Sequence, residues 1–238
     1  MRSYETVLVT GASRGLGAAL GRELAMRGYR VLLAARSEAD LVALIESLPP
    51  EARARAGYLA VDLRRLEGLA SFAAQAQARL GSVDVLINNA GIGSYKPFAE
   101  WSPAELIDCM HVNLMAPMLL SHALLPAMRG RGRGMLLQIA SDLARRYLAN
   151  MAPYVASKFG LLGLSGSLLR EVKGQGIKVT TVLPGIIDSA FGGGREGEKG
   201  ETWSLRPAQL AARVVDLLEL PEHVVIDELA IHPMQQDF

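Results

Sequence analysis

The chain has 238 residues, with 25 basic and 24 acidic side chains and a formal net charge of +1. This balance gives no electrostatic reason to expect a nucleic-acid or membrane partner. The single cysteine excludes an intrachain disulfide and a thiolate-rich metal site. The first ten residues lack a basic segment followed by a long apolar one, and no run of about 20 apolar residues could span a bilayer. We therefore expect a cytoplasmic protein.

Short apolar runs alternate with longer helical patterns along the chain. The expected strands are Thr6–Thr10, Arg30–Ala34, Tyr58–Val61, Val83–Asn88, Met135–Ile139 and Val179–Leu183. The expected helices are Leu16–Arg27, Glu38–Leu48, Leu66–Leu80, Pro103–Met128 and Tyr154–Lys173. Strands that are apolar throughout are typical of a parallel sheet covered on both faces. The pattern predicts a single α/β domain over residues 1–238, with a doubly wound, Rossmann-like parallel sheet and helices on both faces.

A glycine-rich turn, Thr10–Gly17 (TGASRGLG), connects the first strand to the first helix. Glycines permit a tight turn there, and the helix N-terminus offers backbone amides and partial positive charge to an anion. The spacing G-x-x-x-G-x-G is not that of other dinucleotide folds, and a turn needed only for helix–strand packing is the alternative. The position directly after the first strand favours a dinucleotide pyrophosphate.

Two arginines indicate which dinucleotide would bind. An NAD enzyme usually has an acidic residue after the second strand, where it accepts hydrogen bonds from the ribose 2′-hydroxyl. This chain has Arg36 at that point and Arg14 in the glycine turn. Guanidinium groups can clamp a phosphate bidentately, so the sequence predicts NADP(H) as the cofactor.

A tyrosine and a lysine four residues apart supply a candidate acid and base. Tyr154 and Lys158 share one face of the expected helix. Hydride transfer to a carbonyl builds negative charge on oxygen, and a positioned acid must deliver a proton. A nearby ammonium would lower the pKa of the phenol from its usual value of about 10. Ser141, at the end of the fifth strand, can hold the substrate oxygen. Such a tyrosine–lysine pair also arises by chance on many exposed helices.

Taken in order, these motifs resemble the short-chain dehydrogenase/reductase family in its single-domain, NADP-preferring form. The match runs from Val7 to Asp188. It consists of the Gly11–Gly17 turn, Asp62 after the third strand, Asn88-Asn89-Ala90-Gly91 after the fourth, Asn113, Ser141, Tyr154 with Lys158, and Pro184-Gly185.

The resemblance implies roles for these residues. Tyr154 would be the general acid and base, Ser141 would orient and polarise the carbonyl, Lys158 would hold the nicotinamide ribose, and Asn113 would support a water in a proton relay. The expected cofactor contacts are Gly11, Ser13, Arg14, Gly15, Leu16, Gly17, Arg36, Asp62, Leu63, Asn89, Ala90, Gly91, Tyr154, Lys158, Pro184, Gly185, Ile187 and Ser189. No metal is expected, since the four histidines show no metal-ligand spacing.

Three further features leave alternatives open. Residues 189–204 hold five glycines among charged residues and would form a mobile substrate lid or a flexible surface loop. Asp142, just past Ser141, would select a substrate or lie exposed on a loop. Pro117 has no amide hydrogen for the Asn113 carbonyl, which would leave an acceptor for the relay water or only kink the helix.

We expect an NADP(H)-dependent oxidoreductase that reduces a ketone, aldehyde or 3-oxo compound, or oxidises the corresponding alcohol. The alternative is a non-catalytic NADP(H)-binding sensor or scaffold, which would not need the acid/base group. The resemblance also implies a homodimer or homotetramer formed through the two longest helices, Pro103–Met128 and Tyr154–Lys173. Gly160, Gly163 and Gly166 would let such helices approach closely, or would pack against the sheet.

Overall fold

Within residues 3–236, the part of the chain that the computed structural model describes, seven parallel strands form one sheet. The strands are β1 (Thr6–Thr10), β2 (Arg30–Ala35), β3 (Ala56–Ala60), β4 (Val85–Asn88), β5 (Gly134–Ile139), β6 (Ile177–Pro184) and β7 (Glu228–Ile231). Their order is β3-β2-β1-β4-β5-β6-β7. The winding direction therefore reverses between β1 and β4, and ligands of open α/β sheets bind at such a reversal, outside the carboxyl ends of the strands.

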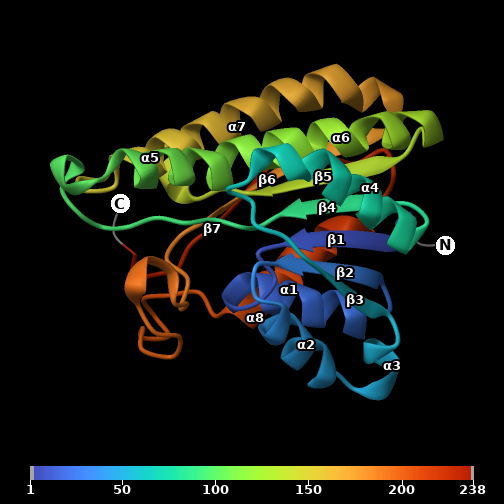
Figure 1. The fold of residues 1–238 in the computed structure, drawn as a ribbon, viewed down its shortest axis with the longest axis horizontal. Helices are drawn as coiled ribbons and strands as arrows, with labels where there is room; N and C mark the ends of the chain where they lie inside the picture. Colours follow the sequence, from blue (N-terminus) through green and yellow to red (C-terminus); the bar gives the residue numbers. More distant parts are fainter. Residues whose placement is uncertain (1–2, 237–238) are drawn as a thin grey trace.

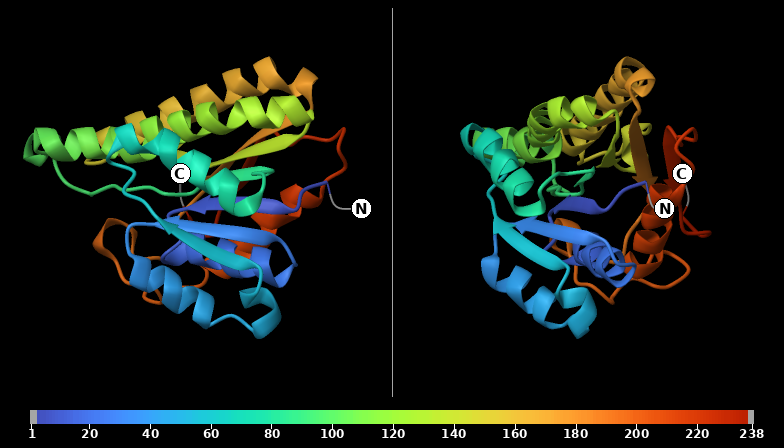
Figure 2. Two further views of the ribbon diagram at one scale, coloured as in Figure 1. Left: turned by 45° about the vertical axis from the view of Figure 1, so that its right-hand side comes forward. Right: turned by 90° about the vertical axis from the view of Figure 1, so that its right-hand side faces the viewer.

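Helices cover both faces of the sheet (Figure 1, Figure 2). One face carries α1 (Gly15–Met26), α2 (Glu38–Glu46), α3 (Pro50–Arg53) and α8 (Pro207–Asp216). The other carries α4 (Leu69–Leu80), α5 (Pro103–Met110), α6 (Ala116–Arg131) and α7 (Ala152–Val172). Short 3-10 turns occur at Leu66–Gly68, Phe98–Glu100, Asp142–Ala144, Lys173–Gln175, Phe191–Gly193 and Leu217–Glu219. The predicted doubly wound α/β fold is confirmed.

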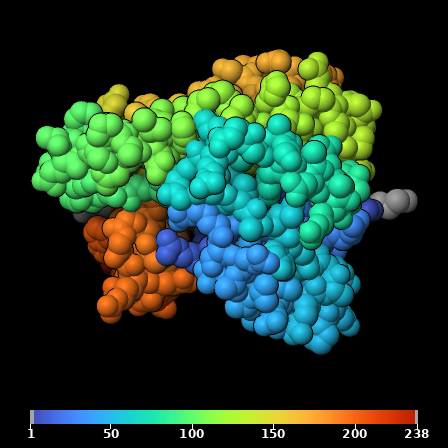
Figure 3. Space-filling view, in the orientation of Figure 1, coloured from blue at the N-terminus to red at the C-terminus, as the bar shows by residue number. Residues whose placement is uncertain are grey.

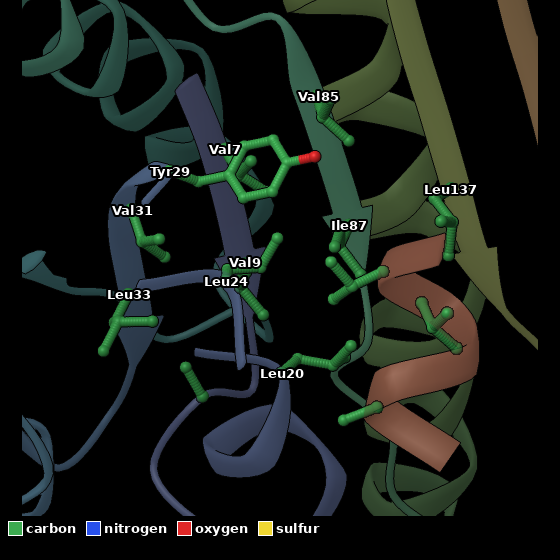
Figure 4. Packing of buried hydrophobic residues seen from close by; sticks show 14 of the residues in the cluster. Val7, Val9, Leu20, Leu24, Tyr29, Val31, Leu33, Val85, Ile87 and Leu137 are labelled. Atoms are coloured by element: carbon green, nitrogen blue, oxygen red, sulfur yellow. The ribbon is translucent and has the colours of Figure 1, made fainter. Parts of the chain in front are cut away.

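The continuous apolar strands supply two cores because successive side chains point to opposite faces. Val7 and Val9 of β1 pack with Leu20 and Leu24 of α1, as Figure 4 shows. Leu8, between the two valines, belongs to the separate cluster on the α4 and α6 face. A strand buried on both faces favours apolar side chains at successive positions, which explains the absence of regular alternation in the sequence.

The long helix predicted over Pro103–Met128 is interrupted. Its start is as expected, since Ser102 and Glu105 form a capping box with Pro103 in the first turn. At His111–Met115 the backbone forms a π-turn, in which the Ala116 amide donates to the His111 carbonyl. A new α-helical segment then begins at Ala116, with Pro117 in its first turn. Pro117 has no amide hydrogen to donate to the Asn113 carbonyl one turn earlier.

The C-terminal third contains elements that the sequence did not predict. β7 was missed because it is only four residues long, Glu228–Ile231, and is half exposed. α8 was also missed, although Leu210, Ala211, Val214 and Val215 mark one buried helical face. The predicted domain also includes residues 1–2 and 237–238, which lie outside the described part. None of the helices described between residues 3 and 236 is long and apolar enough to cross a membrane.

Candidate active site

A cavity of about 800 Å³ lies where the strands of the sheet end. Every residue predicted to contact the cofactor lines it, together with Ser141. These residues come from the loops and helix starts that follow β1 through β6, so parallel strand ends bring them together from across the sequence. The cavity is also lined by Arg64 and Met151, which the sequence did not single out, and by Phe191 and Lys199 of the segment 189–204 that was expected as a lid or loop.

The glycine turn is packed too tightly for side chains. A Cβ on Gly11 would lie 2.7 Å from the Ala90 Cα, and one on Gly17 would overlap the Gly11 carbonyl oxygen. Gly11 also has a φ of +66°, which favours glycine. At the N-cap of α1, within the described structure, the Arg14 side chain makes no capping hydrogen bond. The turn thus serves close packing and also leaves helix N-terminal amides facing the cavity, where an anion can bind.

The adenosine end of the predicted site contains three arginines. Arg14, Arg36 and Arg64 all line the cavity. Arg64 Nε lies 2.9 Å and 3.0 Å from the two carboxylate oxygens of Asp62, and the Arg64 backbone amide donates to Oδ1 at 3.1 Å. The Arg64 side-chain hydrogen bonds are the largest cause that lowers the pKa of Asp62 to about 2, against the opposing effect of burial. Asp62 is therefore ionised at neutral pH, and its carboxylate forms part of the cavity wall.

Asn89 links two strand ends. Its Nδ2 donates to the carbonyls of Thr10 at 3.0 Å and Gly11 at 3.2 Å, and its backbone amide donates to the Thr10 hydroxyl oxygen at 3.1 Å. Asn89 lines the cavity, but its amide hydrogens are directed at the glycine turn. Its contribution here is to hold that turn against the end of β4.

Tyr154 and Lys158 lie on one face of α7 and are both buried. The Lys158 Nζ is 5.6 Å from the centre of the Tyr154 ring and donates to the Ile139 carbonyl at 2.9 Å. Burial lowers the pKa of Lys158 to about 8. Burial also raises the pKa of Tyr154 above its ordinary value, while side-chain hydrogen bonding with Ser141 acts in the opposite direction. The net pKa of the phenol in the free protein is thus raised rather than lowered, because desolvation of the phenolate is the largest effect.

Ser141 follows β5 and is held by its neighbour. Its Oγ donates to Asp142 Oδ1 at 3.0 Å and accepts from the Leu143 amide at 3.2 Å. Asp142 Oδ1 also accepts from the Leu143 amide at 2.8 Å, and Oδ2 accepts from Gln236 Nε2 at 2.8 Å. Asp142 is thus half-buried and fully engaged, unlike the exposed loop charge that the sequence left open.

Asn113 lies behind the cavity wall, fully buried in the π-turn. Its side chain pairs in both directions with the backbone of Ile92, donating to the carbonyl at 2.8 Å and accepting from the amide at 2.8 Å. It also donates to Ser157 Oγ at 3.0 Å. Of the four predicted catalytic residues, Asn113 therefore acts on the cavity through the Ile92 backbone, which lines it.

The glycine-rich segment 189–204 projects from the end of β6, at the same end of the molecule as the segment around residue 100 (Figure 3). Asp188, only 1% exposed, accepts from the amides of Gly197 and Lys199 and pairs with Arg206. Phe191 packs on the Tyr154 ring, with 5.2 Å between ring centres. The segment thus contacts a predicted catalytic residue and is tied at its base by a buried carboxylate, which sequence reasoning had not assigned.

Two of the glycines on α7 have different surroundings. Gly160 packs against Leu114 of the same chain, where a Cβ would lie 2.9 Å from Leu114 Cδ2. A Cβ on Gly163 would meet nothing within 4 Å. No group of three or more His, Cys, Asp or Glu side chains in residues 3–236 is arranged to hold a metal ion.

Comparison with known proteins places this geometry in a family. The model of the short chain dehydrogenase family matches residues 5–199. The ketoacyl reductase HetN of Nostoc is 38% identical over 183 residues, which are 77% of this chain and 63% of HetN, so the chain spans less than two thirds of that relative.

Two solved structures match over nearly the whole chain. An alcohol dehydrogenase from the archaeon Thermococcus sibiricus, complexed with 5-hydroxy-NADP, superimposes with a TM-score of 0.91 at 31% identity and covers 98% of both chains. A metagenomic short-chain oxidoreductase in complex with NADP has a TM-score of 0.83 at 34% identity, also covering 98% of both chains. With the family's motifs gathered around one cavity at the strand ends, this chain belongs to the short-chain dehydrogenase/reductase family of oxidoreductases.

Proposed function

We propose that this protein is an NADP(H)-dependent oxidoreductase that interconverts a carbonyl compound and its alcohol. One observation carries the proposal: a buried tyrosine and lysine, Tyr154 and Lys158, share a single cavity with a glycine turn and three arginines at its other end. A structural or sensor protein would need the dinucleotide end of this cavity but not a buried proton donor at the opposite end.

The residues fit a nicotinamide dinucleotide phosphate. The glycine turn and the start of α1 present backbone amides suited to a pyrophosphate. Arg14 and Arg36 line the cavity and would bind the 2′-phosphate, a group that NAD lacks. The solved relatives that hold NADP or 5-hydroxy-NADP support the same choice. When bound, this cofactor would supply the hydride for reduction or accept it in the reverse reaction.

The protein's own residues would manage the proton and the oxygen. Burial keeps Tyr154 protonated at neutral pH, as a general acid in carbonyl reduction must be. Its hydroxyl would give its proton to the carbonyl oxygen as charge develops there. Ser141 would hold the same oxygen, which requires its hydroxyl hydrogen to turn from Asp142 by rotation about one bond. Lys158, between Tyr154 and the Ile139 carbonyl, would contact the nicotinamide ribose. Asn113 would hold the Ile92 backbone and support the relay.

The cavity end beside Tyr154 favours a substrate with an apolar substituent. Leu143, Met151, Ile186 and Phe191 line that end. The names of the relatives point to two classes, a ketoacyl reductase and an alcohol dehydrogenase. We propose that residues 189–204 act as a lid whose Phe191 ring closes over the substrate next to Tyr154.

A substrate panel tests the proposed function. NADPH consumption is followed at fixed protein concentration with ketones, aldehydes and 3-oxo thioesters, for the natural protein and for Tyr154→Phe. We expect activity that falls by at least about a hundredfold in the variant, the usual range for loss of a general acid, with NADPH affinity retained. NADPH binding without turnover on any member of the panel would favour the sensor alternative.

We also propose a homodimer or homotetramer formed through the α5–α6 and α7 faces, in the cytoplasm. Gly163, which faces open space in the single chain, would lie at that interface. Light scattering coupled to size-exclusion chromatography measures the assembly directly, and Gly163→Arg should shift it toward the monomer. A monomeric natural protein would contradict the proposal.

A further inference from the structure

A side chain from the segment after β7 reaches into the wall of the active-site cavity. Gln236 Nε2 donates to Asp142 Oδ2 at 2.8 Å, and Gln236 Oε1 accepts from the Ile186 amide at 2.7 Å. These partners are 94 and 50 residues away in sequence, in the loops that follow β5 and β6. One carboxamide therefore bridges two loops that both line the cavity.

The bridge has a defined polarity. A carboxamide has one donor end and one acceptor end, a carboxylate only accepts, and a backbone amide only donates. Gln236 can satisfy Asp142 and Ile186 in a single orientation. The chain leaves room for it at Gly185, since a Cβ there would overlap the Gln236 Oε1. Asp142 then uses its other oxygen, Oδ1, to accept the Ser141 hydroxyl at 3.0 Å.

We propose that Gln236 and Asp142 are positioning residues for the reaction, holding Ser141 and the Ile186 backbone at a fixed spacing across the active site. In the free protein Asp142 holds the Ser141 side chain in the rotamer from which its hydroxyl hydrogen would turn to the substrate oxygen, and Gln236 fixes Asp142 relative to the loop after β6. The inference rests on the proposed function, because Ser141 is assigned there to the substrate oxygen. A hydroxyl displaced by about an ångström would lose much of its effect on the reacting oxygen.

The first test removes the bridge and compares it with its neighbour. Gln236→Ala should lower kcat by about tenfold, the scale expected for a misplaced group, while the affinity for NADPH stays within about twofold. Gln235 is exposed and adjacent, so Gln235→Ala is the matched control and should leave kcat and KM unchanged. A bridge that serves stability alone would lower the melting temperature of Gln236→Ala without changing kcat well below that temperature.

The second test exchanges the two partners. Gln236→Glu places one carboxylate against another. Asp142→Asn places an amide donor against the Gln236 Nε2 donor. If the Gln236 carboxamide turned over to avoid this clash, its Nε2 would instead face the Ile186 amide, which is also a donor. Each single variant should lower kcat. The double variant Asp142→Asn with Gln236→Glu restores donor to acceptor at both contacts, and its new amide at position 142 can still accept from Ser141. We expect the double variant to recover most of the kcat lost by either single change.

The same exchange is measured without cofactor or substrate. The melting temperature of the free protein should fall in each single variant and recover in the double variant. Equal kcat values in Gln236→Ala and the natural protein, or single losses that add up in the double variant, would overturn the inference. A natural protein inactive on the whole substrate panel would instead contradict the proposed function, and the melting temperatures would still test the bridge.

Discussion

The buried ammonium of Lys158 makes the stability of this protein depend on pH in a predictable direction. Lys158 is 2% exposed, and burial lowers its pKa from 10.5 to about 8. Between these two values the unfolded chain carries a proton on this lysine that the folded chain lacks. Unfolding then takes up a proton, so the free energy of unfolding rises with pH in this window, by about 1.4 kcal/mol per pH unit. Below about pH 8 both states are charged, and the slope from Lys158 vanishes.

Replacing this lysine isolates the effect. Lys158→Met keeps an unbranched side chain of similar length and removes the titrating group. Urea unfolding at several pH values between 7.5 and 10 gives the free energy for both proteins, and their difference cancels groups common to both, such as Lys178. The natural protein should gain about 1 to 3 kcal/mol relative to the variant across the window. Lys173→Met, which alters an exposed lysine on the same segment, should leave the pH dependence unchanged. Parallel curves for the natural protein and Lys158→Met would refute the reasoning.

Three other changes test the remaining parts of the site. Gly17→Ala should reduce NADPH affinity at least about tenfold and lower the free energy of unfolding by about 1–3 kcal/mol, because its Cβ would overlap the glycine turn. Gly130→Ala is the control. It lies in open space on α6 and should be neutral or stabilising by up to about 1 kcal/mol. Arg36→Asp should reduce the preference for NADPH over NADH at least about tenfold in binding titrations, and an unchanged ratio would remove Arg36 from cofactor selection. Asp188→Asn should speed tryptic cleavage within residues 189–204 and lower kcat/KM, since the buried carboxylate holds that segment; cleavage at the natural rate would show that other contacts fix it.

The sheet and the residues at its strand ends were predictable because local sequence determines both. A strand buried on two faces is mostly apolar, and a tight turn against Ala90 must use glycine at position 11. The positions after β1 to β6 then meet through parallel topology alone. β7 and α8 escaped prediction for different reasons. β7 is a short edge strand, and its four residues are too few to show a pattern. α8 has a clear amphipathic period, but it was overlooked because it follows the glycine-rich segment.

The interactions that tune the site were less predictable because they depend on tertiary contacts. Nothing in the sequence around Tyr154 indicates that burial raises the pKa of its phenol. Asp188 ends the family match, but its role in tying down residues 189–204 requires the loop to fold back on it. Gln236 lies in a C-terminal stretch without a motif, and only the structure brings it to Asp142 and Ile186.

The loops that form the cavity wall are joined by neutral carboxamides. Asn89 holds the glycine turn after β1, Asn113 pairs with the Ile92 backbone after β4, and Gln236 bridges the loops after β5 and β6. A loop at a strand end presents unpaired carbonyls and amides, and leaving these buried without partners would cost free energy. A carboxamide can satisfy a donor and an acceptor together without introducing a second charge beside the cofactor phosphates or the developing oxyanion. Charged side chains in the same positions would change the electrostatics on which the proposed proton transfer from Tyr154 would depend.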